Sequence, residues 1–206
     1  MISHSITNGI NGSANIPGDK SISHRSIIIP SISNGICEIN NILKSDDVLH
    51  TLKAFKDMGV KIIESNQKII IYGQGLKSLK KPGNDIYLGN SGTSARLLTG
   101  LLAAQKFDTV LTGDSSLSNR PMERISEPLN KMNAKIITSN GMMPLKIKGG
   151  GLTPAKFNLK IPSAQIKSGI LLASLNTAGE TFITENKVTR DHTETMLKSF
   201  GADINI

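Results

Sequence analysis

The sequence contains an internal repeat, and this repeat limits the possible folds more than any other feature. In each of three stretches, a short strand is expected to pass through a polar turn into an apolar helix. The stretches read NIPGDKS then HRSIIIPSIS, IYLGNSGTS then ARLLTGLLAA, and LKIPSAQ then IKSGILLASL. Pro17, Leu88 and Ile161 begin the three turns, 71 and 73 residues apart. A repeated supersecondary unit implies a repeated architecture, so we expect three related α/β units.

The segments after each apolar helix extend the repeat. Each unit continues through a short strand (GICEI, TVLTG, TFITE), an amphipathic helix (DDVLHTLKAFKDMG, RPMERISEPLNKMN, RDHTETMLKSFG) and another strand (VKIIES, AKIITS, ADINI). The first two units add a last strand, KIIIYG or PLKIKG, whereas the third adds none. Ser45 is the expected N-cap of the first amphipathic helix, and Gly59 follows its expected end. We therefore expect a piece of a longer protein, cut within its third unit.

The apolar helices have almost no polar face, so they are expected to be buried on all sides. A glycine inside a helix costs about 1 kcal/mol relative to alanine, and Gly100 and Gly169 therefore indicate a close approach of neighbouring helices. Pro30 is expected to kink or shorten the first apolar helix. The strands 144–149 and 156–161 alternate apolar and polar residues, which is typical of a sheet with one wet face. The predicted fold class is α/β (α+β), with buried helices and outer sheets.

Composition narrows the partner to a small anion. A formal net charge of +8 favours an anionic partner. Aromatic residues make up 3% of the chain and tryptophan is absent, so stacking surfaces for nucleic acid are poorly supplied. No apolar run approaches the ~20 residues of a membrane span, and the first residues lack a signal-peptide pattern. We expect a cytoplasmic protein with a phosphorylated or carboxylated small ligand, without nucleic acid or membrane partners.

We interpret the cysteine, the histidines and Arg96 as structural residues and not as reactive ones. Cys37 is the only cysteine and is interpreted as a small core residue. The four histidines show no metal-ligand spacing, so no metal is expected, and His24 is interpreted as a surface or turn residue. Arg96 is interpreted as the partner of a carboxylate.

The polar turns are the candidate binding site. Three helix N-termini would meet at one end of a pseudo-threefold bundle, where free N–H groups and the helix dipole favour an anion. Lys20 lies beside Ser21 and Arg25, which are four residues apart and share a helical face. Any one of these residues, taken singly, is as readily a cap or a solvated charge, but their recurrence at one structural position favours binding. The other candidates are Asn90, Ser91, Gly92 and Thr93 in the second turn, Ser163 and Gln165 in the third, and Arg120 and Arg124 at the start of the second helix of unit two.

Five ordered motifs, PGDKSISHR, LGNSGTSARLL, SNRPMERI, IPSAQIKSGILLA and VTRDHTETML, resemble the 5-enolpyruvylshikimate-3-phosphate synthases, or 3-phosphoshikimate 1-carboxyvinyltransferases. The resemblance covers essentially the whole chain. It implies two domains, each an inside-out barrel of three βαβαββ units with buried helices. Residues 1–17 would begin the other, C-terminal-half domain, and residues 18–206 would form an incomplete N-terminal-half domain. The family transfers the carboxyvinyl group of phosphoenolpyruvate to the 5-hydroxyl of shikimate 3-phosphate and releases phosphate, with neither a metal nor an organic cofactor.

The resemblance also implies roles for individual residues. The acid and base carboxylates would lie in the missing half, so no catalytic residue is expected here. The isolated chain is expected to be inactive and monomeric. Ala164 stands where some members have serine, so only its backbone N–H could bind. The expected phosphoenolpyruvate contacts are Lys20, Gly92, Arg120 and Gln165. The expected shikimate 3-phosphate contacts are Lys20, Ser21, Arg25, Ser163, Ala164, Gln165 and Arg190, while Asn90 and Thr93 shape the loop.

Two alternatives stay open at this point. UDP-N-acetylglucosamine enolpyruvyl transferases have asparagine after the lysine and a reactive cysteine on a mobile loop, whereas Ser21 follows Lys20 here and Cys37 lies in an expected strand. A non-enzymatic polyanion-binding module is opposed by the placement of the cations in recurring turns. Glyphosate competes with phosphoenolpyruvate in the resembled family, and Gly92, where many tolerant members have alanine, predicts a sensitive full-length enzyme.

Overall fold

The first part of the chain forms a small antiparallel sheet with two helices. The computed structural model describes residues 12–65 and 68–206. The strands of this part are ordered β1-β3-β2, and both pairs are antiparallel. Its elements are α1 (Lys20–Ser31), β1 (Asn34–Asn40), α2 (Asp46–Asp57), β2 (Lys61–Glu64) and β3 (Lys68–Gln74).

The second part forms a four-stranded sheet of order β4-β5-β7-β6. Its β4–β5 pair is parallel, and the other two pairs are antiparallel. Along β7, Leu145 and Ile147 are buried while Lys146 and Lys148 are exposed, which confirms the predicted wet face. The elements are β4 (Ile86–Tyr87), α3 (Gly92–Ala103), β5 (Thr109–Thr112), α4 (Ser115–Ser118), α5 (Glu123–Lys131), β6 (Lys135–Ser139) and β7 (Met142–Lys148).

The third part contains a two-stranded parallel sheet, β8–β9, and two helices. Its elements are β8 (Lys156–Leu159), α6 (Ala164–Ser174), β9 (Phe182–Glu185) and α7 (His192–Ser199). The predicted strand at 202–206 is wrong, because this segment has no strand assignment and no described strand pairs with it. The strand predicted just before the turn at Pro17 is wrong for the same reason, and residues 1–11 of the expected domain start at 1–17 lie outside the described residues.

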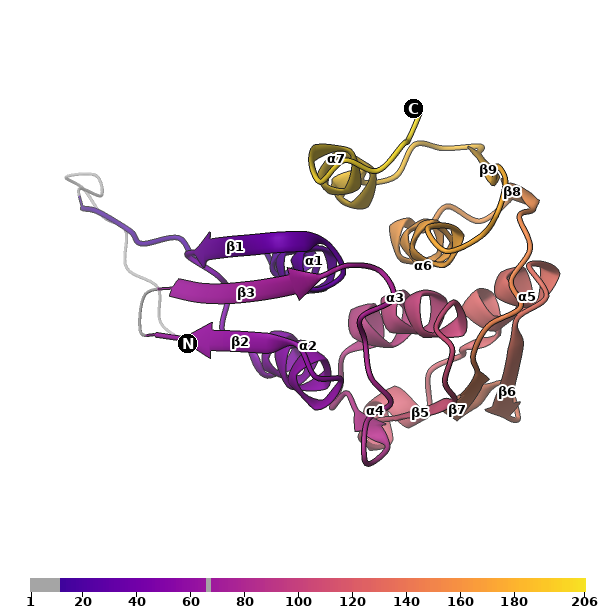
Figure 1. Ribbon diagram of the computed structural model, residues 1–206, viewed down its shortest axis with the longest axis horizontal. Coiled ribbons are helices and arrows are strands. Elements are labelled where there is room, and N and C mark those ends of the chain that lie inside the picture. The colour runs from indigo at the N-terminus through magenta and orange to yellow at the C-terminus, as the bar shows by residue number, and fades with distance from the viewer. Residues whose placement is uncertain (1–11, 66–67) are drawn as a thin grey trace, which may run out of the picture.

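Helices α3 and α6 contact each other in the middle of the molecule, while the sheets lie toward its periphery (Figure 1). Gly100 and Gly169 form the point of closest approach: a Cβ on Gly100 would lie 1.9 Å from the Gly169 carbonyl oxygen. The predicted reason for these two helical glycines is therefore confirmed. The fold is mixed α/β, and its apolar core extends through all three parts of the described chain.

Of two predicted helix boundaries, one agrees with the structure and one does not. Helix α1 ends one residue after Pro30, in agreement with the predicted shortening. Helix α5 begins at Glu123 and not at Arg120. The backbone N–H of Arg120 instead donates to Leu117 at the end of α4, and that of Met122 donates to Gly141 in the β6–β7 turn. These two bonds hold residues 120–122 as a separate turn before the helix.

Candidate functional site

The N-termini of α1, α3 and α6 are capped by their own side chains. The Asp19 carboxylate accepts from Ile22 N at 2.8 Å, Ser91 Oγ from Ser94 N at 3.2 Å, and Ser163 Oγ from Ile166 N at 3.4 Å. For Ser91 and Ser163, the capping interpretation is therefore correct in the free chain. Around these ends lies a small cavity of about 20 Å³, lined by Ser21, Arg25, Thr93, Ala164, Gln165, Arg190 and His192.

Arg25 is the buried cation of this cavity. It is 3% exposed, and none of the described carboxylates forms an ion pair with it. Its guanidinium donates to Thr193 Oγ1 at 2.6 Å, to Ser168 Oγ at 2.8 Å and to the Ser21 carbonyl oxygen at 2.8 Å. Burial lowers the pKa of Arg25, while nearby Glu194 opposes this effect. Because a buried charge is costly without a counter-charge, this guanidinium favours an anionic ligand.

Arg190 brings a second guanidinium to the same cavity. Its Nη1 donates to Ser21 Oγ at 3.3 Å, and its charge adds to the lowering of the Arg25 pKa. We refer to Ser21, Arg25, Ser168, Arg190 and Thr193 as the Arg25 cluster. Two neighbouring guanidinium groups that form no ion pair with a described carboxylate suit a phosphate or carboxylate group, which can accept bidentate hydrogen bonds.

Gln165 connects α6 to α3. Its Nε2 donates to Thr93 Oγ1 at 3.0 Å, and its Oε1 accepts from Arg96 Nη1 at 3.0 Å. Arg96 also donates to the carbonyl oxygens of Gly92 at 3.1 Å and Pro121 at 3.3 Å. The predicted carboxylate partner of Arg96 is therefore wrong: within the described chain, a side-chain amide and two carbonyl groups take its hydrogen bonds. Burial lowers the pKa of Arg96.

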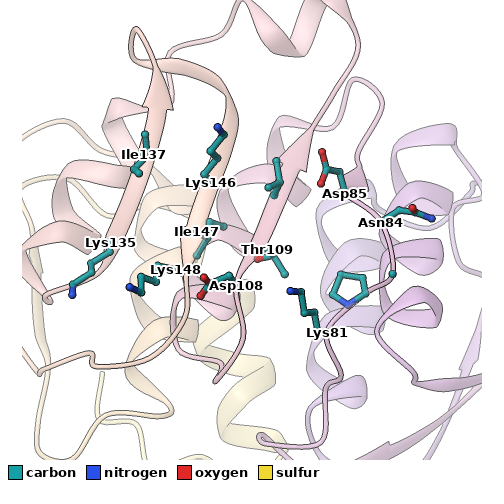
Figure 2. Close-up of a pocket in the computed structure, with 13 residues that line it drawn as sticks. Lys81, Asn84, Asp85, Asp108, Thr109, Lys135, Ile137, Lys146, Ile147 and Lys148 are labelled. Atoms are coloured by element: carbon teal, nitrogen blue, oxygen red, sulfur yellow. The ribbon is translucent and has the colours of Figure 1, made fainter.

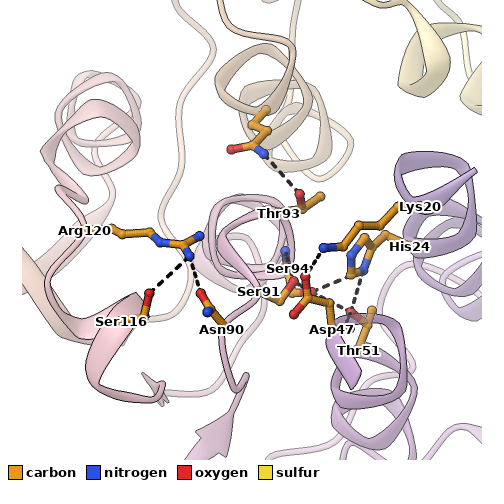
Figure 3. Close-up of polar contacts among 11 residues, drawn as sticks. Lys20, His24, Asp47, Thr51, Asn90, Ser91, Thr93, Ser94, Ser116 and Arg120 are labelled. Carbon is orange, nitrogen blue, oxygen red and sulfur yellow. Dashed lines mark hydrogen bonds and ion pairs between the residues drawn. The ribbon is translucent and has the colours of Figure 1, made fainter. Parts of the chain in front are cut away.

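Arg120 lies on the other side of Gly92. Its Nη2 donates to Asn90 Oδ1 and, at 3.4 Å, to Ser116 Oγ (Figure 3). A Cβ on Gly92 would lie 2.9 Å from Arg96 Nη1 and 3.0 Å from Arg120 Nη1, so the glycine leaves room for two guanidinium groups. The charges of Arg124 and Arg120 further lower the pKa of Arg96, which places a second cationic group of residues beside Gly92.

Lys20 forms an ion pair with Asp47 of α2, and this pair borders a buried polar network (Figure 3). His24 Nδ1 lies 2.8 Å from Thr51 Oγ1 and 3.3 Å from Ser94 Oγ. Ser94 Oγ in turn lies 2.5 Å from Thr51 Oγ1 and 2.6 Å from Ser91 Oγ. We refer to His24, Thr51, Ser91 and Ser94 as the His24 network, which connects α1, α2 and the start of α3.

The surface interpretation of His24 is wrong, because its side chain is fully buried in this network. Burial is the main reason that its pKa falls to about 4; Lys20 and Arg25 lower it further, and Asp47 opposes them. His24 is therefore neutral near pH 7. The core interpretation of Cys37 is also wrong: it is partly exposed in β1, an edge strand of its sheet.

Beneath the Arg25 cluster, Lys167 forms ion pairs with Glu185 at 2.7 Å and with Glu194 at 2.6 Å. Burial alone would lower the Lys167 pKa, but hydrogen bonds to both glutamates outweigh it and raise the pKa. Burial would raise the pKa of Glu185, but hydrogen bonds from Lys167 and Thr189 lower it. Both glutamates share the Lys167 ammonium group, so this group offers no free cation to a ligand.

The structure brings together most, but not all, of the predicted site residues. One cavity is lined by Ser21, Arg25, Thr93, Ala164, Gln165 and Arg190, whereas Lys20, Asn90, Gly92, Arg120 and Ser163 lie outside its lining. The sequence interpretation missed Asp47, Ser168 and Thr193. Their only local signal is position: Ser168 is one helical turn after Ala164, and Thr193 lies within the TRDHTE motif.

None of the helices in residues 12–65 and 68–206 has the length and apolar character of a membrane span. No group of three or more histidine, cysteine, aspartate and glutamate residues in that part of the chain could hold a metal ion.

Comparisons with known proteins identify the family that this chain resembles. The family described as EPSP synthase (3-phosphoshikimate 1-carboxyvinyltransferase) matches residues 5–206. The 3-phosphoshikimate 1-carboxyvinyltransferase of Ruthia magnifica subsp. Calyptogena magnifica is 55% identical over 201 residues, which cover 97% of this chain and 46% of the relative. The protein of the same name from Streptococcus agalactiae serotype V is 48% identical over 202 residues, covering 97% and 47%.

A solved structure gives the same result at the level of the fold. The EPSP synthase from Acinetobacter baumannii superposes with a TM-score of 0.91 at 51% sequence identity. The match covers 95% of this chain and 45% of that structure. The chain thus spans about half the length of the relatives it matches.

Proposed function

The chain belongs to the EPSP synthase family, and from this premise we propose that it is the substrate-binding portion of a 3-phosphoshikimate 1-carboxyvinyltransferase. Such an enzyme transfers the carboxyvinyl group of phosphoenolpyruvate to the 5-hydroxyl of shikimate 3-phosphate and releases phosphate. The observation that carries the proposal is the buried guanidinium of Arg25, which has no ion-pair partner among the described residues and lies beside Arg190 at a cavity where three helix N-termini meet.

We assign shikimate 3-phosphate to the Arg25 cluster. The Arg25 and Arg190 guanidinium groups would neutralise its phosphate, and Ser21 Oγ would bind the same anion. The cavity of about 20 Å³ holds only one small group, so the rest of the metabolite would lie on the surface around it. The proposed contacts are Lys20, Ser21, Arg25, Ser163, the backbone N–H of Ala164, Gln165 and Arg190.

We assign phosphoenolpyruvate to the side of Gly92. A ligand can approach the α3 N-terminus closely there, since glycine has no Cβ, and Arg120 would supply the opposing charge. Gln165 lies between the two assigned sites through its bonds to Thr93 and Arg96, so it is placed to contact both substrates. The proposed contacts are Lys20, Gly92, Arg120 and Gln165, with Asn90 and Thr93 shaping the loop.

The chemistry that these residues supply is charge neutralisation and orientation. During transfer, the methylene of phosphoenolpyruvate gains a proton, the adjacent carbon develops cationic character, and the 5-hydroxyl attacks it. Two polyanions must first be held side by side, and the cations of this site reduce their mutual repulsion and fix their geometry. We assign proton transfer to the other half of the enzyme, so the isolated chain should show no turnover.

We propose the same division into domains that the resemblance implies. Residues 18–206 would form three βαβαββ units of an inside-out barrel, the third of them incomplete, and residues 1–17 would begin the other domain. The sheets, the helical order and the α3–α6 contact support this arrangement. The other half of the protein would then be the partner of the surface that carries Arg25, Arg120 and Arg190. We propose that the whole enzyme acts as a monomer in the cytoplasm.

Titration calorimetry with shikimate 3-phosphate tests the assignment. The chain should bind this ligand, and Arg25→Met should weaken binding by about 100-fold, since two charge-assisted hydrogen bonds are worth about 3 kcal/mol together. Lys53→Met, which removes an exposed charge paired with Asp57 on α2, should leave binding unchanged. Absence of heat from the folded chain at millimolar ligand would overturn the assignment.

A further inference from the structure

A second concave surface lies on the outer face of the four-stranded sheet, away from the helix N-termini. It is an open groove of about 550 Å³ between the segment 81–85 and strands β5, β7 and β6 (Figure 2). We refer to it as the sheet groove and define it by Lys81, Asp108, Val110, Lys135, Lys146 and Lys148. Its volume is within the range of small-molecule sites, about 300–1,000 Å³.

The strand register places like charges opposite each other in this groove. Lys135 of β6 pairs with Lys148 of β7, and Lys146 is two residues from Lys148 on the same exposed face. Directly opposed residues of an antiparallel pair have Cβ atoms about 5 Å apart, and like charges at such positions destabilise a sheet. The bound state of an anion would remove this repulsion.

The groove lysines have no ion-pair partner in the part of the chain that the structure describes. Among the ion pairs of the described residues, none involves Lys81, Lys135, Lys146 or Lys148. The groove also contains two carboxylates, Asp85 and Asp108, of which Asp108 accepts from the Gly149 N–H at 3.2 Å. Four lysines against two aspartates leave the groove cationic.

The sheet of the first part, in contrast, has an ion pair on its outer face. Lys68 of β3 forms an ion pair at 2.9 Å with Glu38 of the neighbouring strand β1. A lysine on an outer sheet face of this protein can therefore be neutralised by a neighbouring glutamate. Among the described residues, the groove lysines therefore differ from Lys68 in having no carboxylate partner.

The strand register also shows which residues form the outer face of the groove. Val110 of β5 pairs with Lys146 of β7 on that face, whereas the neighbouring Thr109 pairs with Ile147 and is buried with it on the inner face. Successive residues of a strand point to opposite faces, so the lysines project from the sheet next to an apolar floor that includes Val110.

We propose that the sheet groove binds a compact polyanion with two or more phosphate groups, such as a free polyphosphate or a phosphorylated metabolite. The lysine ammonium groups are point charges with rotatable donors, which suit phosphate oxygens in several orientations. The site is separate from the Arg25 cluster, and the proposal does not rest on the function assigned to that cluster.

Titration of the folded chain with sodium tripolyphosphate at low salt tests the proposal, with amide chemical shifts as the readout. Shift changes should centre on residues 108–110, 135–137 and 146–148. The double variant Lys135→Gln/Lys148→Gln should weaken binding at least tenfold. Lys77→Gln/Lys198→Gln, an equal charge change at two exposed lysines outside both sites, should weaken it no more than twofold.

Three further measurements distinguish the sheet groove from binding at the Arg25 cluster, from a general charge effect and from a nucleic-acid surface. Arg25→Met should leave tripolyphosphate binding unchanged, and a loss there would assign the anion to the Arg25 cluster and overturn the proposal. Equal losses in the two double variants, or no binding at all, would show only the general effect of net charge and would also overturn it. ATP and tripolyphosphate should compete for the groove, whereas tight binding of single-stranded DNA that tripolyphosphate does not displace would replace the proposal with a nucleic-acid surface.

The single variant Lys146→Gln guards against a folding defect in the double variant. It keeps Lys135 and Lys148 and should weaken tripolyphosphate binding about threefold. Removing the opposed pair should not lower the thermal midpoint, since like charges are being removed. A Lys146→Gln chain that is folded and binds as tightly as the parent would count against the groove.

Discussion

Arg25 and Arg120, the two arginines to which we assign opposite sides of the site, are held in contrasting ways. Arg25 is buried and donates to side chains of α6 and α7 and to the backbone of its own helix. Arg120 is partly exposed in a turn and donates to Asn90 and Ser116. Arg25 is thus fixed by the packing of three helices before any ligand arrives, whereas Arg120 is held only by Asn90 of the turn before α3 and by Ser116 of the short helix α4. The difference indicates a preorganised shikimate 3-phosphate side and an adaptable phosphoenolpyruvate side.

The largest effect is expected where the support of Arg25 is broken. Lys167→Met leaves Glu185 and Glu194 without their shared cation in a region where both side chains are largely buried. Breaking a buried ion pair by removing one partner costs about 3–5 kcal/mol. Urea denaturation should show a loss of about 3 kcal/mol, and a loss below about 1 kcal/mol would mean that α6 and α7 do not depend on this contact.

The next effect concerns His24, which lies between the two sides. Its folded pKa of about 4 is below the unfolded value of 6.5, so only the unfolded chain gains a proton between these pH values. The His24 contribution is therefore constant above pH 6.5 and falls by about 3 kcal/mol as the pH drops to 4. Urea unfolding of the parent and of His24→Asn at several pH values measures it. The difference between the two stabilities should change over this window, and parallel curves would contradict the burial of a neutral imidazole.

A smaller effect of opposite sign is expected for Arg25 itself. Replacing a buried charge by an apolar side chain of similar volume is often neutral or stabilising. In Arg25→Met, the Ser168 and Thr193 hydroxyls, 2.7 Å apart, can still bond to each other. The free energy of unfolding should therefore rise by about 1 kcal/mol, although shikimate 3-phosphate binding is weakened. A fall in stability of that size would show that Arg25 is retained for the fold and not for the ligand.

The smallest effect is expected for Arg120→Ala. Substitutions of exposed side chains usually change stability by less than about 0.5 kcal/mol. The thermal midpoint and shikimate 3-phosphate affinity should stay close to those of the parent chain. A loss of stability comparable to that of Lys167→Met would remove the contrast between the two sides of the site.

Much of the site could be found from the sequence because its residues recur in one position of a repeat. Ser21, Thr93 and Gln165 each lie within two residues of a helix start, and the structure places all three at one cavity. The close approach at Gly100 and Gly169 could be predicted for a similar reason, since a glycine is unfavourable inside a helix unless space requires it.

Other features depend on contacts between distant segments. Arg25 and Thr193 are 168 positions apart, and His24 and Ser94 are 70 apart, so no local pattern predicts these hydrogen bonds. The expectation that His24 is exposed was wrong. A polar residue on an apolar helix can hydrogen-bond either to water at the surface or to a partner in the interior. Only the positions of α2 and α3 decide between them.

The sequence by itself determined most of the helices and strands, the burial of the apolar helices and the turns that carry the candidate site residues. These properties follow from periodicity and from the chemistry of single residues, both of which are local. The tertiary structure alone decided which charges are neutralised: Lys20, Lys68 and Lys167 have carboxylate partners, whereas Arg25 and the lysines of the sheet groove have none among the described residues. Electrostatic energy depends on distance and burial, and both are set only when segments far apart in the chain come together.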